Sequence, residues 1–412
     1  MSGMRFNTAL LHDGADLNET HGATLPPVYQ ASAFHHASAE EMAAIFGHRA
    51  PGYSYTRVGN PSLAAFETRI TRLENGVSSV AFSSGMAAIS GAVLNIVAAG
   101  DEIVASRGLY GGTYYLFKDL RSLGIATKFV DITDRAAVET AVSEKTRLIF
   151  AETIGNPSLE VADIPMLAEV AKAHGIPLII DNTAATAYLA RPLDLGADIV
   201  VNSTSKYVNG SGSAISGVLT DGGTFNWRSP KYPEFASYAK YRKFAFTAKL
   251  RNGFARDLGG CLAPMNAFLN IIGLETLGLR MKQACDNALA MAEWLSREHP
   301  ELQVNYPGLP GARTRDTAGR VLRNGFGAIL TLRAGSRERA FAIMNRLRLM
   351  YRISNIGDSR TLIIHPGSTL ALENTPEERE GSGVYDDLLR ISLGIEDAAD
   401  LIEDLRQALE AG

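Results

Sequence analysis

Short apolar runs alternate with amphipathic segments through the middle of the chain. Between the runs, segments such as 86–98, 136–142 and 164–174 carry apolar residues at the spacing of a helix. Seven runs are rich in β-branched residues and predict strands over 79–82, 102–105, 126–130, 147–151, 177–181, 198–202 and 215–220. Strands that alternate with helices are typical of an α/β fold with a mostly parallel sheet.

The two ends of the chain have different patterns. Residues 1–60 are rich in His, Pro, Gly and Tyr and show little periodicity, so we expect an extended arm there. Apolar residues recur at helical spacing from about 264 to 294, which predicts a helical link to a smaller C-terminal α+β unit. Its expected elements are strands near 327–332, 361–364 and 389–393 and a final helix over 397–409. The expected division is an arm over 1–60, a large domain over 61–264, and a linking helix with a small domain over 265–412.

Composition and charge narrow the classes of function. The chain has 412 residues, 46% of them hydrophobic, which suffices for two or more domains. Its 40 basic and 44 acidic residues are spread along the chain, so neither nucleic acid nor a membrane surface is an expected partner. Only Cys261 and Cys285 are present, without metal-ligand spacing, which favours a reducing compartment and no metal. No signal-peptide pattern or long apolar window occurs, and we expect a cytoplasmic protein.

Polar groups follow the predicted strands at the edge where an open α/β sheet binds its ligands. The turn 84–86 opens a helix, and its backbone N–H groups suit a phosphate, although an ordinary strand-to-helix turn has the same pattern. Asp181 ends the fifth strand, as a functional acid or a helix cap. Lys206 follows the sixth strand among hydroxyl side chains. Tyr110, after the second strand, is either a stacking platform or a core aromatic.

Taken together, the lysine, the acid and the turn match the requirements of pyridoxal phosphate. The aldehyde of this cofactor needs an amine, its pyridine nitrogen needs a carboxylate, and its phosphate needs backbone donors. Lys206, Asp181 and the turn 84–86 fit these three needs. A nicotinamide dehydrogenase would also have an α/β sheet, but no G-x-G-x-x-G follows the first strand.

Motifs along the whole chain resemble those of the Cys/Met-metabolism, or transsulfuration, family of pyridoxal-phosphate enzymes. The resemblance runs from about Phe6 to the final helix. It implies fold type I, like that of aspartate aminotransferase, with a large domain around a mostly parallel seven-stranded sheet and a smaller C-terminal α+β domain. The motifs that carry it are Y-S-Y-T-R-V-G-N-P at 53–61, S-G-M at 84–86, L-Y-G-G-T at 109–113, E-T at 152–153 with N-P at 156–157, D-N-T at 181–183, S-T-S-K-Y at 203–207 and R-I-S-L-G-I-E-D at 390–397.

This resemblance implies a role for each candidate site residue. Lys206 would bind the cofactor aldehyde and then move protons, while Asp181 would pair with the pyridine nitrogen. Tyr110 would stack on the ring and act as the candidate acid. Arg390, with Asn355 nearby, would grip the α-carboxylate of the substrate, because a guanidinium fork matches a carboxylate. The other implied cofactor contacts are Ser84, Gly85, Met86, Asn156, Thr183, Ser203 and Ser205.

The arm has an implied role of its own. In this family the Tyr-x-Arg motif of the arm reaches the active site of a neighbouring subunit. Tyr55 and Arg57 occupy the motif here, so they would contact the partner's cofactor phosphate, with Tyr55 also near the substrate. The resemblance therefore implies an obligate homodimer, commonly paired into a homotetramer.

Three segments resemble the O-acetylhomoserine sulfhydrylases of the family more than its lyases. They are 109–113, in which Gly112 stands where methionine γ-lyases often carry a cysteine, 225–277 and 355–369. The resemblance implies γ-replacement on O-acetyl-L-homoserine, in which acetate leaves and sulfide or a small thiol gives homocysteine or methionine. A methionine γ-lyase, or a cystathionine lyase or synthase, would use the same residues. A non-catalytic binder of the cofactor is a further alternative.

Overall fold

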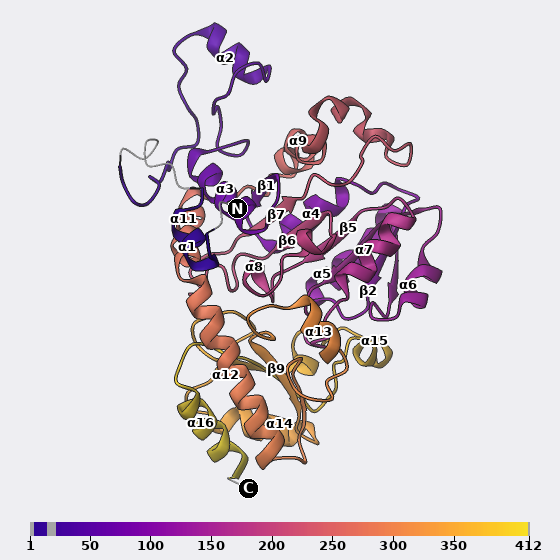
Figure 1. Ribbon diagram of the computed structural model, residues 1–412, viewed down its shortest axis with the longest axis vertical. Coiled ribbons are helices and arrows are strands. Elements are labelled where there is room, and N and C mark those ends of the chain that lie inside the picture. The colour runs from indigo at the N-terminus through magenta and orange to yellow at the C-terminus, as the bar shows by residue number, and fades with distance from the viewer. Residues whose placement is uncertain (1–3, 15–21, 411–412) are drawn as a thin grey trace.

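Two β-sheets of different size form the two halves of the structure, a computed structural model that describes residues 4–14 and 22–410 (Figure 1). The larger sheet has the strand order β1-β7-β6-β5-β4-β2-β3, and the smaller has the order β10-β11-β12-β9-β8. The strands of the larger sheet are β1 (Ser78–Phe82), β2 (Glu102–Ser106), β3 (Ala126–Val130), β4 (Thr146–Glu152), β5 (Leu178–Asp181), β6 (Ile199–Asn202) and β7 (Gly217–Asp221). Those of the smaller sheet are β8 (Gln303–Asn305), β9 (Ile329–Arg333), β10 (Tyr351–Arg352), β11 (Leu362–Ile364) and β12 (Leu388–Ser392).

The larger sheet is mostly parallel, which confirms the fold class expected from the sequence. β7 pairs antiparallel with β1 and β6, whereas β6, β5, β4, β2 and β3 pair in parallel. Every strand except β7 therefore ends at the same edge of the sheet. That edge collects the segments after β1, β2, β4, β5 and β6, which carry most of the candidate site residues.

Helices cover both faces of the larger sheet. They are α3 (Pro61–Leu73), α4 (Gly85–Leu94), α5 (Gly111–Asp119), α6 (Arg135–Ala141), α7 (Ile164–Ala173), α8 (Thr186–Leu189), α9 (Ala245–Asn252), α10 (Phe254–Asp257) and α11 (Pro264–Glu275). Leu148 and Phe150 of β4 lie in one core with α4, α5 and α9, whereas Ile149 and Ala151 lie in another core with α3, α7 and α11. A strand buried on both sides is apolar throughout, which explains the continuous apolar runs of the sequence.

A long helix, α12 (Leu277–Glu298), runs from the larger half into the smaller one (Figure 1). The sequence predicted one helical segment over 264–294, and the structure divides it at Thr276, between α11 and α12. β8 and β10 were not predicted, because strands of three and two residues are too short for a visible alternation. Neither α12 nor any other helix in the described ranges is long and apolar enough to cross a membrane. The remaining helices are α13 (Arg315–Val321), α14 (Arg337–Arg346), α15 (Pro376–Gly381) and α16 (Ala398–Glu410), with 3₁₀ helices at Leu120–Leu123, Pro192–Leu195, Pro233–Phe244 and Pro366–Ser368.

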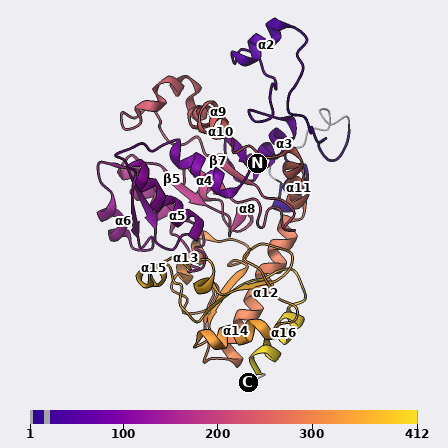
Figure 2. The ribbon, with the colours of Figure 1, turned by 180° about the vertical axis from the view of Figure 1, so that it is seen from behind.

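The N-terminal arm contains two helices that the sequence pattern did not predict. α1 (Phe6–His12) packs against α11 and α12, and Leu10 is only 2% exposed. α2 (Ala39–Phe46) has no buried residue and stands away from the body in both views (Figures 1 and 2). Helices of seven and eight residues are too short for a 3.6-residue period to stand out in the sequence. We propose to keep the division of the chain at residues 60 and 264.

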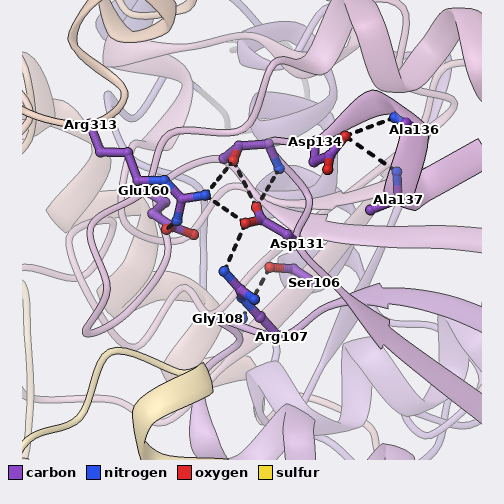
Figure 3. Close-up of polar contacts among 10 residues, drawn as sticks. Ser106, Arg107, Gly108, Asp131, Asp134, Ala136, Ala137, Glu160 and Arg313 are labelled. Carbon is purple, nitrogen blue, oxygen red and sulfur yellow. Dashed lines mark hydrogen bonds and ion pairs between the residues drawn. The ribbon is translucent and has the colours of Figure 1, made fainter.

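Ion pairs join the small domain to the loop 154–161, between β4 and α7, and to the segment after β3 (Figure 3). Asp131 follows β3 and pairs with Arg107 Nη2 at 2.7 Å and with Arg313 Nη2 at 2.5 Å. The same Arg313 guanidinium also pairs with Glu160. The loop is therefore held from the outside by a residue of the small domain.

The start of β7 touches the backbone of the turn after β1. Gly217 is paired with Phe82, and a Cβ added to it would lie 2.1 Å from the carbonyl oxygen of Ser84. Contacts this short between a side chain and backbone are not tolerated, so only glycine lets the turn sit where it does. The position of the turn 84–86 thus depends on a glycine, Gly217, in the neighbouring strand β7.

We predict that Gly217→Ala will destabilise the fold and displace the turn 84–86. The free energy of unfolding, measured in urea, should fall by about 1 to 3 kcal/mol, the usual range for an overpacked core position. Gly381→Ala is the matched control, because no atom lies within 4 Å of the added carbon at that helical position. Equal stability of the Gly217→Ala and Gly381→Ala proteins would show that the close approach does not constrain the turn.

Candidate active site

A cavity of about 240 Å³ opens at the carboxyl edge of the larger sheet. It is walled by the segments after five strands of that sheet and by residues 354–356 and 390 of the small domain. Twelve of the candidate site residues line it together: Ser84, Gly85, Met86, Tyr110, Asn156, Asp181, Thr183, Ser203, Ser205, Lys206, Asn355 and Arg390.

The turns after β1 and β6 are packed against each other. Ser84 caps α4 by accepting the N–H of Ala87 at 3.1 Å. A Cβ on Gly85 would lie 2.5 Å from Ser203 Cβ, so glycine is required for the contact. The N–H of Ser203 donates to Thr183 Oγ1 at 2.7 Å, which ties the segment after β5 to the same place. The first turn of α4 has N–H groups without partners in the helix, and here they face a cavity that can hold an anion.

Ser205 has a different environment from the one expected of a phosphate donor. Its hydroxyl donates to the Ser216 carbonyl at 2.9 Å and accepts the Ser216 N–H at 2.8 Å. A hydroxyl has a single proton, so this arrangement leaves none for a phosphate oxygen. The contact with Ser216 of the neighbouring segment could not be read from the sequence, because the two residues belong to separate elements.

Two buried carboxyl groups lie side by side beneath the cavity. Glu152 of β4 is in register with Asp181 of β5, and the side chains are 8% and 7% exposed. Burial raises the pKa of Asp181, although hydrogen bonds from Thr183 oppose the rise. Burial, and then the charge of Asp181, raise the pKa of Glu152 well above its ordinary value. Two adjacent buried anions are unfavourable, so we assign the proton to Glu152 and the charge to Asp181.

Glu152 also orders the residues around it, a role that sequence reasoning missed. Glu152 Oε1 accepts the backbone N–H of Tyr110 at 2.6 Å, and the backbone N–H of Asn156 also bonds to this carboxyl group. Glu152 belongs to the motif at 152–153, but no role was predicted for it from the sequence. Its place at the carboxyl end of a buried strand is the same signal that singled out Asp181, and it could have been found in that way.

Two basic side chains, Lys206 and Arg390, also line the cavity. Lys206 Nζ donates to Asn355 Oδ1 at 2.5 Å, and burial followed by the charge of Arg390 lowers the pKa of Lys206. Arg390 is 3% exposed and donates to Asn156 Oδ1 and to the Asn355 carbonyl, both at 2.9 Å. Burial lowers the pKa of Arg390 to about 10. Its Nε is buried and has no hydrogen-bond partner among the described residues.

The Tyr110 ring is placed by its neighbours at the entrance to α5. The side chain lies against the cavity and is 38% exposed. A Cβ on Gly112 would lie 2.6 Å from Cε1 of the Tyr110 ring. A larger residue at Gly112, such as the cysteine found in some lyases of the resembled family, would therefore require the ring to move.

The two arm residues are not brought into this cavity by their own chain. Arg57 lines a separate hollow and donates from Nη1 to the Arg256 carbonyl at 2.6 Å. Its guanidinium lies over the Tyr55 ring, 5.5 Å from the ring centre, and Tyr55 is 46% exposed. Neither Tyr55 nor Arg57 lines the cavity of its own chain, and their contact with a partner's site stays a prediction.

Behind the strand ends lies a further buried acid, Glu74, which sequence reasoning also missed. Glu74 follows α3 and is 2% exposed. Its Oε1 accepts from Asn202 Nδ2 at 2.9 Å and from Asn182 Nδ2 at 3.4 Å. Asn182 follows Asp181 and Asn202 precedes Ser203, so Glu74 holds the backs of two segments whose front sides line the cavity. Burial raises the pKa of Glu74 to about 7.

Known proteins resemble this chain along nearly its full length. The sequence model of the family described as Cys/Met metabolism PLP-dependent enzymes matches residues 7–410. A homocysteine synthase from Schizosaccharomyces pombe is 40% identical, with 98% of each chain covered. An O-acetyl-L-homoserine sulfhydrylase from Leptospira meyeri is also 40% identical, with 98% of this chain and 96% of that one covered.

The likeness extends to a solved structure. A protein from Campylobacter jejuni described as an O-acetylhomoserine (thiol)-lyase, with pyridoxyl-lysine phosphate in its crystal structure, matches with a TM-score of 0.94. The two chains are 33% identical, and the match covers 99% of this chain and 100% of that one. Both sheets and the cavity between them therefore have counterparts in that protein.

Within the described residues, no group of three or more His, Cys, Asp or Glu side chains is arranged to hold a metal ion. The polar groups of the cavity are instead one amine, one guanidinium, amides, hydroxyls and two neighbouring carboxyl groups. This donor set suits an organic cofactor with a phosphate and a basic ring nitrogen.

We predict that Glu74 makes stability fall as pH rises. Between about pH 4.5 and pH 7 the folded state keeps a proton on Glu74 that the unfolded state has lost, so rising pH favours unfolding. Glu74→Gln cannot titrate, and its stability relative to wild type should therefore increase across that window, by on the order of 2 to 3 kcal/mol. Urea unfolding at several pH values measures the difference.

Glu293→Gln on the exposed face of α12 is the control for the same change of side chain, and should leave the pH dependence as in wild type. If the stability curves of wild type and Glu74→Gln ran parallel through the window, Glu74 would be ionised in the folded protein.

Proposed function

Because the chain belongs to the Cys/Met-metabolism family of pyridoxal-phosphate-dependent enzymes, we propose that it is an O-acetyl-L-homoserine sulfhydrylase. In this reaction sulfide displaces acetate from Cγ of O-acetyl-L-homoserine and gives homocysteine, and a small thiol such as methanethiol gives methionine. The observation that carries the proposal is 40% identity to enzymes of this name over 98% of the chain. The amino-acid substrate fits a cavity with one buried cation for its carboxylate.

The residues of the cavity fit pyridoxal phosphate. When bound, this cofactor supplies an aldehyde that joins the substrate amino group and a ring that withdraws electrons from the substrate carbons. Lys206 is the amine placed to hold the aldehyde, and ionised Asp181 is the anion placed for the ring nitrogen. The N–H groups at the start of α4, with Ser203 and Thr183 beside them, are placed for the phosphate.

Arg390 orients the substrate through its carboxylate. Two of its guanidinium nitrogens are already held by Asn156 and Asn355, which fixes the plane of the fork. The Nε proton has no partner among the described residues, and a buried cation without an anion is unfavourable. A substrate carboxylate supplies both the missing acceptor and the missing charge, and charge-assisted pairs of this kind contribute roughly 1.5 to 3 kcal/mol.

Lys206 serves as the base that moves protons on the substrate. Its lowered pKa increases the fraction of neutral amine, which is the form that can accept a proton from Cα and then from Cβ. Asn355 accepts a hydrogen bond from the same amine and so limits where it points. Tyr110, whose ring borders the cavity, is the candidate acid near the leaving acetate.

A second subunit completes the proposed site. Arg57 lines a hollow of its own and Tyr55 is exposed, on an arm that also carries exposed apolar residues such as Met42 and Phe46. A homodimer in which each arm reaches the partner's cavity would place Arg57 beside a phosphate dianion, a strongly favourable pair when partly desolvated. Two such dimers can associate further into a homotetramer.

The substrate assay tests the reaction. We predict that the purified protein with pyridoxal phosphate turns over O-acetyl-L-homoserine with sulfide or methanethiol and releases acetate. Turnover should be faster than with O-succinyl- or O-phosphohomoserine, and the Lys206→Ala protein is the inactive control. Formation of ammonia and a 2-oxo acid from methionine or cystathionine, with no thiol added and at the higher rate, would instead identify a γ-lyase.

Subunit mixing tests the shared site. Lys206→Ala chains and Arg57→Ala chains should each be inactive alone, and their hybrid dimer should own one site with both residues intact. After dissociation and random reassociation we predict roughly a quarter of wild-type activity, since half of the dimers are hybrids with one intact site. Each variant taken alone through the same procedure is the control. No recovery, with hybrids confirmed by mass, would show that each chain builds its site by itself.

A further inference from the structure

The segment that carries Lys206 is a hydrogen-bonded turn that follows β6. The N–H of Lys206 donates to the Ser203 carbonyl at 3.2 Å, and the Lys206 carbonyl accepts the N–H of Gly210 at 2.8 Å. The last carbonyls of the turn accept no backbone N–H among the described residues. In this segment those are the carbonyls of Tyr207 and Val208, directly after the lysine.

Arg280 supplies the missing partners. Its Nη1 donates to the Tyr207 carbonyl at 2.6 Å and its Nη2 to the Val208 carbonyl at 3.2 Å. The same guanidinium donates to the Gly273 carbonyl at 2.5 Å and, from Nε, to Thr276 Oγ1 at 3.1 Å. One cation therefore joins the lysine turn to the junction between α11 and α12.

The electrostatic environment of Arg280 indicates whether it stabilises mainly the lysine turn or α12. It lies in the first turn of α12, where the helix dipole disfavours a cation. Among the described residues no carboxylate forms an ion pair with it, and burial lowers its pKa to about 10. At the carboxyl end of the lysine turn, by contrast, the carbonyls carry partial negative charge that favours a cation. The contact with the lysine turn, and not the stability of α12, accounts for an arginine here.

Three glycines allow the turn to be enclosed this tightly. A Cβ on Gly210 would lie 2.0 Å from Arg280 Nη1, and one on Gly273 would lie 2.4 Å from the Val208 carbonyl. A Cβ on Gly357 would lie 2.5 Å from the Tyr207 nitrogen. Because the turn is packed from three directions, it has little room to adjust. Replacing Arg280 is therefore expected to shift the main chain of Lys206.

We propose that Arg280 is a positioning residue that fixes the main chain beside Lys206 and thereby aims the lysine amine into the cavity. The inference deepens the proposed function, because it concerns the lysine of that same site. Arg280 also lies at the start of the helix that leads into the small domain. The contact therefore sets Lys206 relative to Asn355 and Arg390, which the small domain contributes.

The test compares Arg280→Ala with Lys282→Ala, which removes an exposed cation two residues along the same helix. We expect Arg280→Ala to lower kcat roughly tenfold to a hundredfold with a smaller change in KM, since a misplaced reacting group loses rate on that order. The pH dependence of the visible absorbance of bound pyridoxal phosphate should shift as well. Guanidinium at a concentration that does not unfold the protein should restore part of both, and Lys282→Ala should behave as wild type.

An Arg280→Ala protein with wild-type absorbance and kcat would overturn the proposal, and so would a loss that guanidinium does not restore at all. If this variant does not fold, Arg280→Lys gives the same readouts. A single ammonium cannot replace a planar fork that serves two segments, so the same shifts in absorbance and kcat are expected, and their absence counts against the proposal. The absorbance measurement needs no substrate, so it reports on Arg280 even if the protein does not act on O-acetyl-L-homoserine.

Discussion

Charge buried without an opposite charge beside it is the constraint on which the site depends. Arg390 and Lys206 both lose hydration, and Arg390 further lowers the pKa of Lys206. Burial acts in the opposite direction on the carboxyl groups of Asp181 and Glu152, whose pKa values it raises. Amide side chains and main-chain groups hold all four, but they supply dipoles and no compensating charge. A cofactor with a phosphate and a cationic ring, and a substrate with a carboxylate, bring the charges that the cavity residues lack.

The fold meets this constraint by bringing distant segments together at one edge. Parallel strands end side by side, so side chains from five separate stretches of sequence face one cavity without any long loop. The small domain then closes the cavity with Asn355 and Arg390. Contacts behind the lining, made by Glu74 and Arg280, fix the strand ends from the side opposite to the cavity. Polar side chains therefore form both the lining of the cavity and a second layer directly behind it, which contains Glu74 and Arg280.

Much of this could be predicted from the sequence, because strand ends are visible as the points where apolar runs stop. That rule located Asp181 and Lys206, and the motifs of the resembled family placed Tyr110 and Arg390 beside them. The rule does not reveal which side-chain atoms are already engaged, so the contact between Ser205 and Ser216 appeared only in the structure. Strands β8 and β10 and helix α1 were not predicted because they are too short for a repeating pattern to stand out.

The polar residues of the second layer were not predicted for a different reason. Glu74 follows α3 and Arg280 lies in α12, among many surface charges of the same kind, and only their burial against specific partners distinguishes them. Burial of a single polar residue depends on tertiary contacts that no local pattern encodes. The position of Tyr55 and Arg57 outside the cavity is of the same kind, because it depends on how the arm leaves the body.

The loop 154–161 is anchored at both of its surfaces, and the two anchors respond differently to the solvent. Outside, Arg313 pairs with Asp131 and Glu160, and about half of its side chain is exposed. Inside, Asn156 accepts from Arg390, which is almost fully buried. Mobile ions screen the outer pairs and do not reach the inner bond. Ionic strength thus acts on one side of the loop only, and raising it would weaken the pairs made by Arg313 while the hydrogen bond between Asn156 and Arg390 persists.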